Sequence, residues 1–219
     1  MKRVLFVLSV LAVLSMLVSS AAALSDSEYK EMMKDPNFAK TEKELSSVWA
    51  EAKAKLSKEH FEHLQNSQRE WLSKTRDEYA ENVMKSDPKL SRVQAYTTAT
   101  EDRIDDIKSA IWASSMKPED ADRVFTMHTK GDNGYTVDMT HDDKTGTVTA
   151  DFYAWGSQKS LWKAEGKLSG NVLTVSNDKG SAVITFWDLD TISVKTGEKL
   201  KSNGISIDGT YTPQPRTYE

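Results

Sequence analysis

Cysteine is absent from this 219-residue chain, and histidine occurs only four times. The first absence excludes disulfide bonds, thiolate catalysis and cysteine-ligated zinc, and the second leaves few residues for metal or triad chemistry. An excess of basic residues is also missing, since 29 basic and 33 acidic residues give a net charge of −4. We therefore expect no nucleic-acid partner, because such a partner usually requires a basic surface.

The N-terminal residues have the pattern of a signal peptide. Lys2 and Arg3 precede an almost wholly apolar stretch at 4–18, and small residues at 21–23 follow it. We expect cleavage after Ala23 and a periplasmic or secreted protein without a membrane partner thereafter. The alternative is an uncleaved membrane anchor, since the apolar stretch approaches the length of a spanning helix.

Glycine is missing from residues 24–117, and all ten glycines lie from Gly131 onward. The glycine-free part is rich in Ala, Glu, Lys and Leu, which favour helix. The later part alternates apolar and polar residues between turn signals, which favours strands. The composition predicts a helical domain at 24–117 and an all-β domain at 118–219.

Three stretches of the first domain carry apolar residues at helical spacing. The first follows Asp35-Pro36, the second follows a predicted N-cap at Ser57, and the third is expected to begin at Asp87-Pro88. Three amphipathic helices with short connections predict an antiparallel three-helix bundle. Seven or eight short strands at the spacing of the second domain predict an antiparallel β-barrel or sandwich, so the fold class is α+β.

Few residue groups point to metal, cofactor or enzyme chemistry. His60 and His63 are spaced like a metal pair, but no third histidine or cysteine lies near, so we interpret them as part of a solvated helix face. The acidic residues Asp138, Asp142 and Asp143 do not have the order of a calcium loop. No Gly-x-Ser-x-Gly elbow or phosphate-binding glycine loop is present. We therefore expect no metal, no cofactor and no enzymatic activity.

The most distinctive segment runs from Leu64 to Asp77. Gln68, Trp71 and Thr75 share a helix face, and a buried glutamine beside a tryptophan requires hydrogen-bond partners. The segment thus predicts a polar contact between helices. We interpret it first as a device for helix packing, and second as a partner-binding motif that includes Gln68, Trp71, Arg76 and Asp77.

The pattern Leu64-x3-Gln68-x2-Trp71-Leu72-x3-Arg76-Asp77 resembles the signature of the lysozyme-inhibitor LprI-like family of small bacterial envelope proteins. Thr100, Arg103, Ile104 and Ile107 are similar to the second element of that signature. The resemblance covers about residues 26–115, and 120–212 resembles the β domain that some members append. Members usually carry cysteines beside these helices, where this chain has Ala80.

The resemblance implies an inhibitor of lysozyme that acts by non-covalent binding. An acidic chain would attract a cationic lysozyme, and residues 119–219 hold 11 basic against 15 acidic residues. Loops to consider as binding sites are those around Asp142-Asp143, Trp155-Gly156-Ser157 and Asn177-Asp178. The alternative is a non-enzymatic adaptor module for a peptide, glycan or lipid, in which Trp155 and Trp162 line a ligand surface instead of the core.

Overall fold

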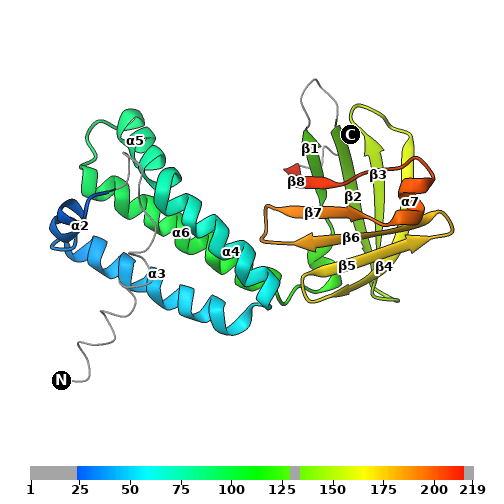
Figure 1. Ribbon diagram of the computed structural model, residues 1–219, viewed down its shortest axis with the longest axis horizontal. Coiled ribbons are helices and arrows are strands. Elements are labelled where there is room, and N and C mark those ends of the chain that lie inside the picture. The colour runs from blue at the N-terminus through cyan, green and yellow to red at the C-terminus, as the bar shows by residue number, and fades with distance from the viewer. Residues whose placement is uncertain (1–23, 129–133, 215–219) are drawn as a thin grey trace. The chain divides into compact units, whose positions relative to one another are not determined.

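The computed structural model describes residues 24–128 and 134–214, and the predicted signal peptide lies outside them. The chain divides into two compact units that meet between Lys108 and Ser109. The first unit is helical, and the second contains a β-barrel (Figure 1). Among the described helices, none is long and apolar enough to cross a membrane.

The prediction of an N-terminal three-helix bundle is wrong. The α-helices described before the barrel number five, namely α2 (Asp26–Met32), α3 (Pro36–Lys55), α4 (Lys58–Glu70), α5 (Arg76–Ser86) and α6 (Arg92–Ala113). One addition is α2, which begins with a capping box between Ser25 and Glu28. The other difference is a π-helical segment, η1 (Trp71–Thr75), which divides the predicted second helix into α4 and α5.

The π-helical segment decides which side chains face the interior of the helical unit. In an α-helix, two residues five positions apart point about 140° away from each other. In η1, the backbone N–H of Arg76 donates to the carbonyl of Trp71, and this wider turn brings both side chains to one side. The guanidinium carbon of Arg76 consequently lies 5.2 Å from the centroid of the Trp71 ring, and both residues are buried.

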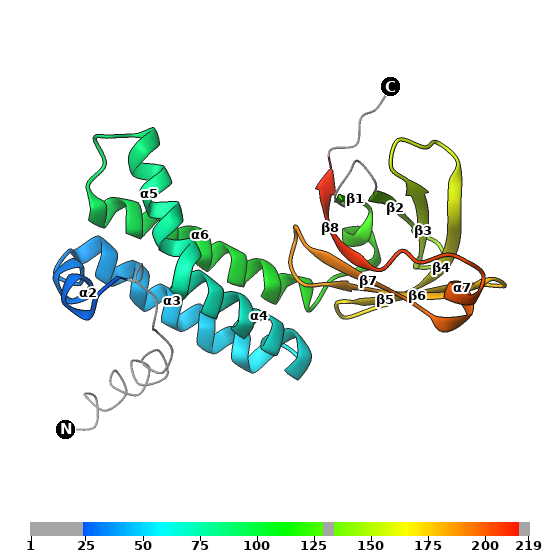
Figure 2. The ribbon, with the colours of Figure 1, turned by 45° about the horizontal axis from the view of Figure 1, so that its top comes forward.

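Helix α6 begins later than the expected start at Asp87-Pro88. Asp87 instead ends α5, where its backbone N–H donates to the carbonyl of Val83. Ser91 supplies the cap of α6, because its hydroxyl accepts from the N–H of Gln94 at 3.3 Å. Figures 1 and 2 show α3, α4 and α6 side by side, and an ion pair of 2.9 Å joins Lys108 of α6 to Glu44 of α3.

Eight antiparallel strands form a closed barrel, which confirms the barrel alternative over the sandwich. Each strand pairs with the next in the sequence, and β1 pairs with β8. The strands are β1 (Val124–His128), β2 (Gly134–Asp142), β3 (Thr147–Ala154), β4 (Ser160–Ser169), β5 (Val172–Asn177), β6 (Gly180–Phe186), β7 (Ile192–Thr196) and β8 (Gly209–Gln214). Closure leaves no open edge among the eight described strands for pairing with another chain.

Apolar side chains fill the barrel, as alternation along the strands predicts. The Phe152 ring centroid lies 5.7 Å from that of Trp162 and 6.4 Å from that of Tyr211. Trp162 is 2% exposed, whereas Trp155 is 40% exposed. Trp162 therefore belongs to the core, and only Trp155 lies at the surface.

Short helical segments cover parts of the two ends of the barrel. The first end contains η2 (Pro118–Ala121) and the β2–β3 and β6–β7 turns; the buried side chains of Ala113, Met116 and Ala121 belong to the barrel core. The second end contains α7 (Glu198–Ser202) and the β3–β4 and β5–β6 turns. A Cβ on Gly180 would lie 2.6 Å from the backbone nitrogen of Leu200, so this close approach of β6 to α7 requires glycine.

Candidate functional site

The two elements of the helical motif meet inside the helical unit. Arg103 of α6 donates from Nε to Oε1 of Gln68 on α4 at 2.7 Å. Arg103 is 5% exposed, so this bond satisfies part of a buried guanidinium group. The predicted polar contact between helices is thus present, and it involves the glutamine named from the sequence.

Arg76 and Asp77 extend this polar interior toward the start of α6. Asp77 accepts a hydrogen bond from the hydroxyl of Tyr96 at 2.7 Å. The guanidinium carbon of Arg76 lies 5.7 Å from the centroid of the Tyr96 ring, and its Nε lies 4.0 Å from Oδ1 of Asp77. Burial and the bond to Asp77 raise the pKa of Tyr96. Four interior residues therefore hold η1, α5 and α6 together: Trp71, Arg76, Asp77 and Tyr96.

Sequence reasoning missed the partners that α2 and α3 add to this interior. Glu42 accepts from the Tyr29 hydroxyl at 2.9 Å and from the Thr100 hydroxyl at 3.3 Å. Burial raises the pKa of Glu42, while the bond from Tyr29 and the positive charge of Arg76 oppose that rise. Burial and the nearby Glu42 carboxylate also raise the pKa of Tyr29. The only signal in the sequence is the helical spacing of Glu42 from Phe38, which places the two on one face.

At the first end of the barrel, His141 of β2 lies between two carboxylates. Its Nδ1 is 3.1 Å from Oδ2 of Asp122, and its Nε2 is 2.9 Å from Oδ1 of Asp143. A neutral imidazole carries one N–H, so the ring donates to both carboxylates only when it is protonated. The hydrogen bond to Asp143 and then that to Asp122 raise the pKa of His141, against the opposing effect of burial.

Arg123 connects the same end to the β6–β7 turn. Its Nη1 donates to the carbonyl of Leu189 at 2.9 Å, and its guanidinium carbon lies 5.6 Å from the Trp112 ring centroid. The N–H of Leu189 in turn donates to the hydroxyl of Ser109 at 2.7 Å. These contacts and those of His141 link the chain around η2 to the β2–β3 and β6–β7 turns.

Carboxylates outnumber cations at this end. Segments 117–123, 142–144 and 188–190 carry seven acidic residues, Glu119, Asp120, Asp122, Asp142, Asp143, Asp188 and Asp190. Their basic residues are Lys117, Arg123 and Lys144. We name this set of ten charged residues the acidic end. Turn hydrogen bonds fix several of its carboxylates, since Asp142 accepts from the N–H of Lys144 and Asp188 from that of Asp190, both at 2.8 Å.

The structure places the other loop candidates at the second end. Trp155 and Ser157 lie between β3 and β4, and the Ser157 hydroxyl accepts from the N–H of Lys159 at 3.1 Å. Strand β3 has eight residues, which separates these loop residues from Asp142 and Asp143 by roughly 25 Å. One compact partner loop cannot contact both groups, so they define two separate surfaces. The Asn177-Asp178 turn shares the second end with Trp155.

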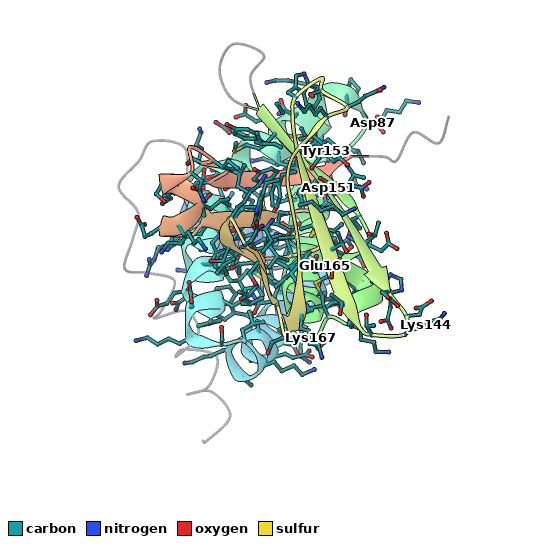
Figure 3. All side chains as sticks on the ribbon, turned by 90° about the vertical axis from the view of Figure 1, so that its right-hand side faces the viewer. Asp87, Lys144, Asp151, Tyr153, Glu165 and Lys167 are labelled. Atoms are coloured by element: carbon teal, nitrogen blue, oxygen red, sulfur yellow. The ribbon has the colours of Figure 1, made fainter. Side chains whose placement is uncertain are left out.

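A polar row on the outer face of β3 and β4 was not predicted. Asp151 accepts from the Ser160 hydroxyl at 2.5 Å, and its Oδ2 lies 3.8 Å from Nζ of Lys163. Burial and the hydrogen bond to Asp151 raise the pKa of Tyr153 to about 12. Figure 3 shows Tyr153, Asp151, Glu165 and Lys167 following one another along this face. Alternation with the apolar residues of β3 and β4 is the signal that could have identified it.

The interpretation of His60 and His63 as a solvated pair requires correction. His60 is 1% exposed and belongs to the interior, whereas His63 is exposed. The N-cap at Ser57 contributes to this placement, because its hydroxyl accepts from the N–H of His60 at 3.2 Å. Over residues 24–128 and 134–214, no three His, Cys, Asp or Glu side chains form a group that could hold a metal ion.

Comparisons of the chain with protein-family models, with curated proteins and with solved structures returned no match.

Proposed function

We propose that this chain is an exported binding protein without enzymatic activity, which inhibits a cationic lysozyme by non-covalent contact through the acidic end of its barrel. The observation that carries the proposal is the concentration of seven carboxylates against three cations in the segments joined by His141 and Arg123. Such a surface attracts a cationic protein over several ångströms and raises the association rate.

The helical unit supports the proposal through the family resemblance. Gln68 belongs to the first element of the motif and Arg103 to the second, and they form a direct hydrogen bond of 2.7 Å. This contact gives a physical reason for the two elements to occur together in one chain. We assign the helical motif to the stability of the helical unit and the inhibitory contact to the barrel.

The geometry of His141 favours binding over catalysis. Both ring nitrogens face carboxylates, so neither is available to take a proton from a nucleophile or water. The acidic end then acts on a partner through its field and its shape, with no bond made or broken.

The test is a lysozyme assay with residues 24–219. Glu119→Gln, Asp143→Asn and Asp190→Asn together raise the charge of the acidic end by three units while keeping side-chain size. The control carries Glu165→Gln, Asp178→Asn and Glu198→Gln, which make the same change in net charge elsewhere on the barrel. All six side chains belong to exposed residues, so both variants should fold.

We expect the unaltered protein to inhibit, the first triple variant to lose about tenfold or more in apparent affinity, and the control to lose less than about threefold. Inhibition should also weaken as salt rises from about 0.05 to 0.3 M, because salt screens charges across the approaching surfaces. Full lysozyme turnover at a large molar excess of the unaltered protein would refute the proposal. Equal losses of apparent affinity in the two triple variants would show that the acidic end is not the inhibitory surface.

Export is a separate part of the proposal, with its own test. Expression of the full chain in a bacterium, followed by intact-mass measurement of the periplasmic or secreted protein, should give a chain that begins at Leu24. A mature chain that begins elsewhere, or retention of residues 1–23, would contradict the cleavage site.

A second candidate function is an envelope adaptor module that binds a partner without inhibiting an enzyme. The exposure of Trp155 and Leu161, 40% and 38% respectively, favours a contact surface at the second end of the barrel. Absence of lysozyme inhibition together with binding at this surface would favour the adaptor.

A further inference from the structure

Two large apolar side chains are exposed together at the second end of the barrel. Tyr153 pairs with Ser160 and Phe152 with Trp162, so Leu161 is an additional residue of β4 with no partner on β3. This β-bulge is accompanied by 38% exposure of Leu161, and Trp155, just beyond the end of β3, is 40% exposed. We name Tyr153, Trp155 and Leu161 the rim patch.

Lysines occur on three segments at the same end of the barrel as the rim patch. The stretch from Phe152 to Ala164 contains Lys159 and Lys163 and no acidic residue. The β5–β6 turn adds Lys179, and α7 adds Lys199 and Lys201. Four carboxylates lie beside these five lysines, namely those of Asp151, Asp178, Glu198 and Asp208, and Asp151 and Asp208 form ion pairs with Lys163 and Lys201. The second end is therefore net positive by one charge, while the acidic end is net negative by four.

Side-chain hydrogen bonds hold these segments next to one another. Nδ2 of Asn177 donates to the carbonyl of Lys163 at 2.7 Å, which ties the β5–β6 turn to β4. Nδ2 of Asn203 donates to the carbonyl of Lys179 at 2.7 Å, which ties the chain after α7 to the same turn. The lysines of β4, the β5–β6 turn and α7 therefore form one rim with the patch.

We propose that this rim docks on the surface of an anionic phospholipid bilayer, with Trp155 and Leu161 entering the headgroup region and the lysines facing lipid phosphates. Tryptophan is favoured at membrane interfaces, and each lysine near an anionic surface strengthens binding. The exposure of Leu161 favours a lipid partner over an anionic glycan. Burial of an aliphatic side chain at the acyl boundary is energetically favourable, whereas an aliphatic side chain offers no planar face for stacking on a sugar ring.

The proposal changes one expectation from the sequence, which was that the exported chain has no membrane partner. It is independent of lysozyme inhibition, because the rim patch and the acidic end occupy opposite ends of the barrel. Docking by the second end would leave the acidic end directed away from the bilayer.

The experiment uses residues 24–219, which contain every described helix and strand, and sediments them with vesicles. One set of vesicles is phosphatidylcholine alone, and the other contains about a third phosphatidylglycerol. We expect sedimentation with the anionic vesicles and little with the neutral ones.

Trp155→Ala with Leu161→Ser should lower the partition coefficient about tenfold. Lys159→Gln with Lys179→Gln should lower the partition coefficient about 25-fold, from about fivefold for each lysine.

Matched controls remove similar side chains elsewhere. Met33→Ser with Tyr79→Ala alters exposed apolar residues of the helical unit, and Lys117→Gln with Lys144→Gln alters two cations of the acidic end. Both controls should bind vesicles like the unaltered protein, and circular dichroism should show that all variants fold. No sedimentation with anionic vesicles would overturn the proposal, as would equal losses in test and control variants. Binding to a soluble anionic polysaccharide in place of vesicles would overturn it in favour of a glycan.

Discussion

The hydrogen bond between Gln68 and Arg103 allows a quantitative test of the interior of the helical unit. Gln68→Leu removes the acceptor for Nε of Arg103, which is 5% exposed and lies 2.7 Å from Gln68 Oε1. A hydrogen bond to a charged group contributes about 1.5–3 kcal/mol, and the loss leaves a buried donor unpaired. We therefore expect the free energy of unfolding of the helical unit to fall by about 2 kcal/mol.

The assay is urea denaturation followed by far-ultraviolet circular dichroism, which reports mainly on helices. With a denaturant slope of about 2 kcal/mol/M, the midpoint of the helical transition should fall by about 1 M. Gln65→Leu is the matched control, because it makes the same change at another half-buried position of α4. Its midpoint should move by less than about 0.3 M.

A double-mutant cycle isolates the interaction between the two side chains. Arg103→Met alone should also destabilise the unit, while Gln68→Leu with Arg103→Met should recover part of the loss, since two apolar groups then face each other. A coupling free energy below about 0.5 kcal/mol would refute the assigned role of this pair. Equal effects of Gln68→Leu and Gln65→Leu would refute it as well.

Two further predictions concern the barrel. The pKa of His141 is raised above its ordinary value of 6.5 by hydrogen bonds to Asp143 and Asp122, so its stabilising contribution is complete at lower pH and is lost as pH rises through the raised pKa. The melting temperature should thus fall more steeply with rising pH in the unaltered protein than in His141→Gln, and parallel pH profiles would contradict this. A Cβ on Gly166 would lie 1.8 Å from the carbonyl oxygen of Thr174, so Gly166→Ala should cost about 3 kcal/mol by separating β4 from β5. Gly156→Ala, at φ +72° with open space around it, should cost about 1 kcal/mol, and the reverse order in thermal melts would argue against the strand contact.

Local signals predicted several element starts. Asp35 caps α3 by accepting from the N–H groups of Asn37 and Phe38, and Ser57 caps α4, as their side chains and positions indicated. The alternation of Val148, Ala150 and Phe152 likewise predicted the inward face of β3. Such signals are readable because they depend on residues within one turn or one strand.

The division of the second predicted helix could not be read in the same way. A π-helical turn at Trp71–Thr75 has poorer local hydrogen-bond geometry than an α-helical turn. It buries both Trp71 and Arg76, and it places the Arg76 guanidinium over the Tyr96 ring of α6. The partner lies about twenty residues further along the chain. The caps at Ser25 and Ser91 are a different case, because Ser25-x-x-Glu28 and Ser91-x-x-Gln94 are local capping-box patterns that sequence reasoning overlooked in favour of Asp87-Pro88.

The candidate sites show the same limit. Asp142, Asp143, Trp155 and Ser157 were named as loop residues. The structure places the last three in loops and Asp142 at the end of β2, and only the register of β3 shows that the two pairs belong to opposite ends. Trp162 and Trp155 looked equivalent in sequence, and the bulge at Leu161 together with barrel closure placed one inside and one at the surface. One of the two carboxylate partners of His141 is Asp122, which lies nineteen residues away in the sequence and could not be assigned from local patterns.

The sequence by itself determined the helical and β parts, most strand alternation and the glutamine that bridges two helices, because side-chain period and hydrogen-bonding need are local properties. Tertiary structure decided the number of helices, the choice of a barrel over a sandwich, the burial of His60 and the separation of an acidic end from a basic, apolar rim. These features depend on contacts between residues far apart in the chain, whose free energies no local pattern contains.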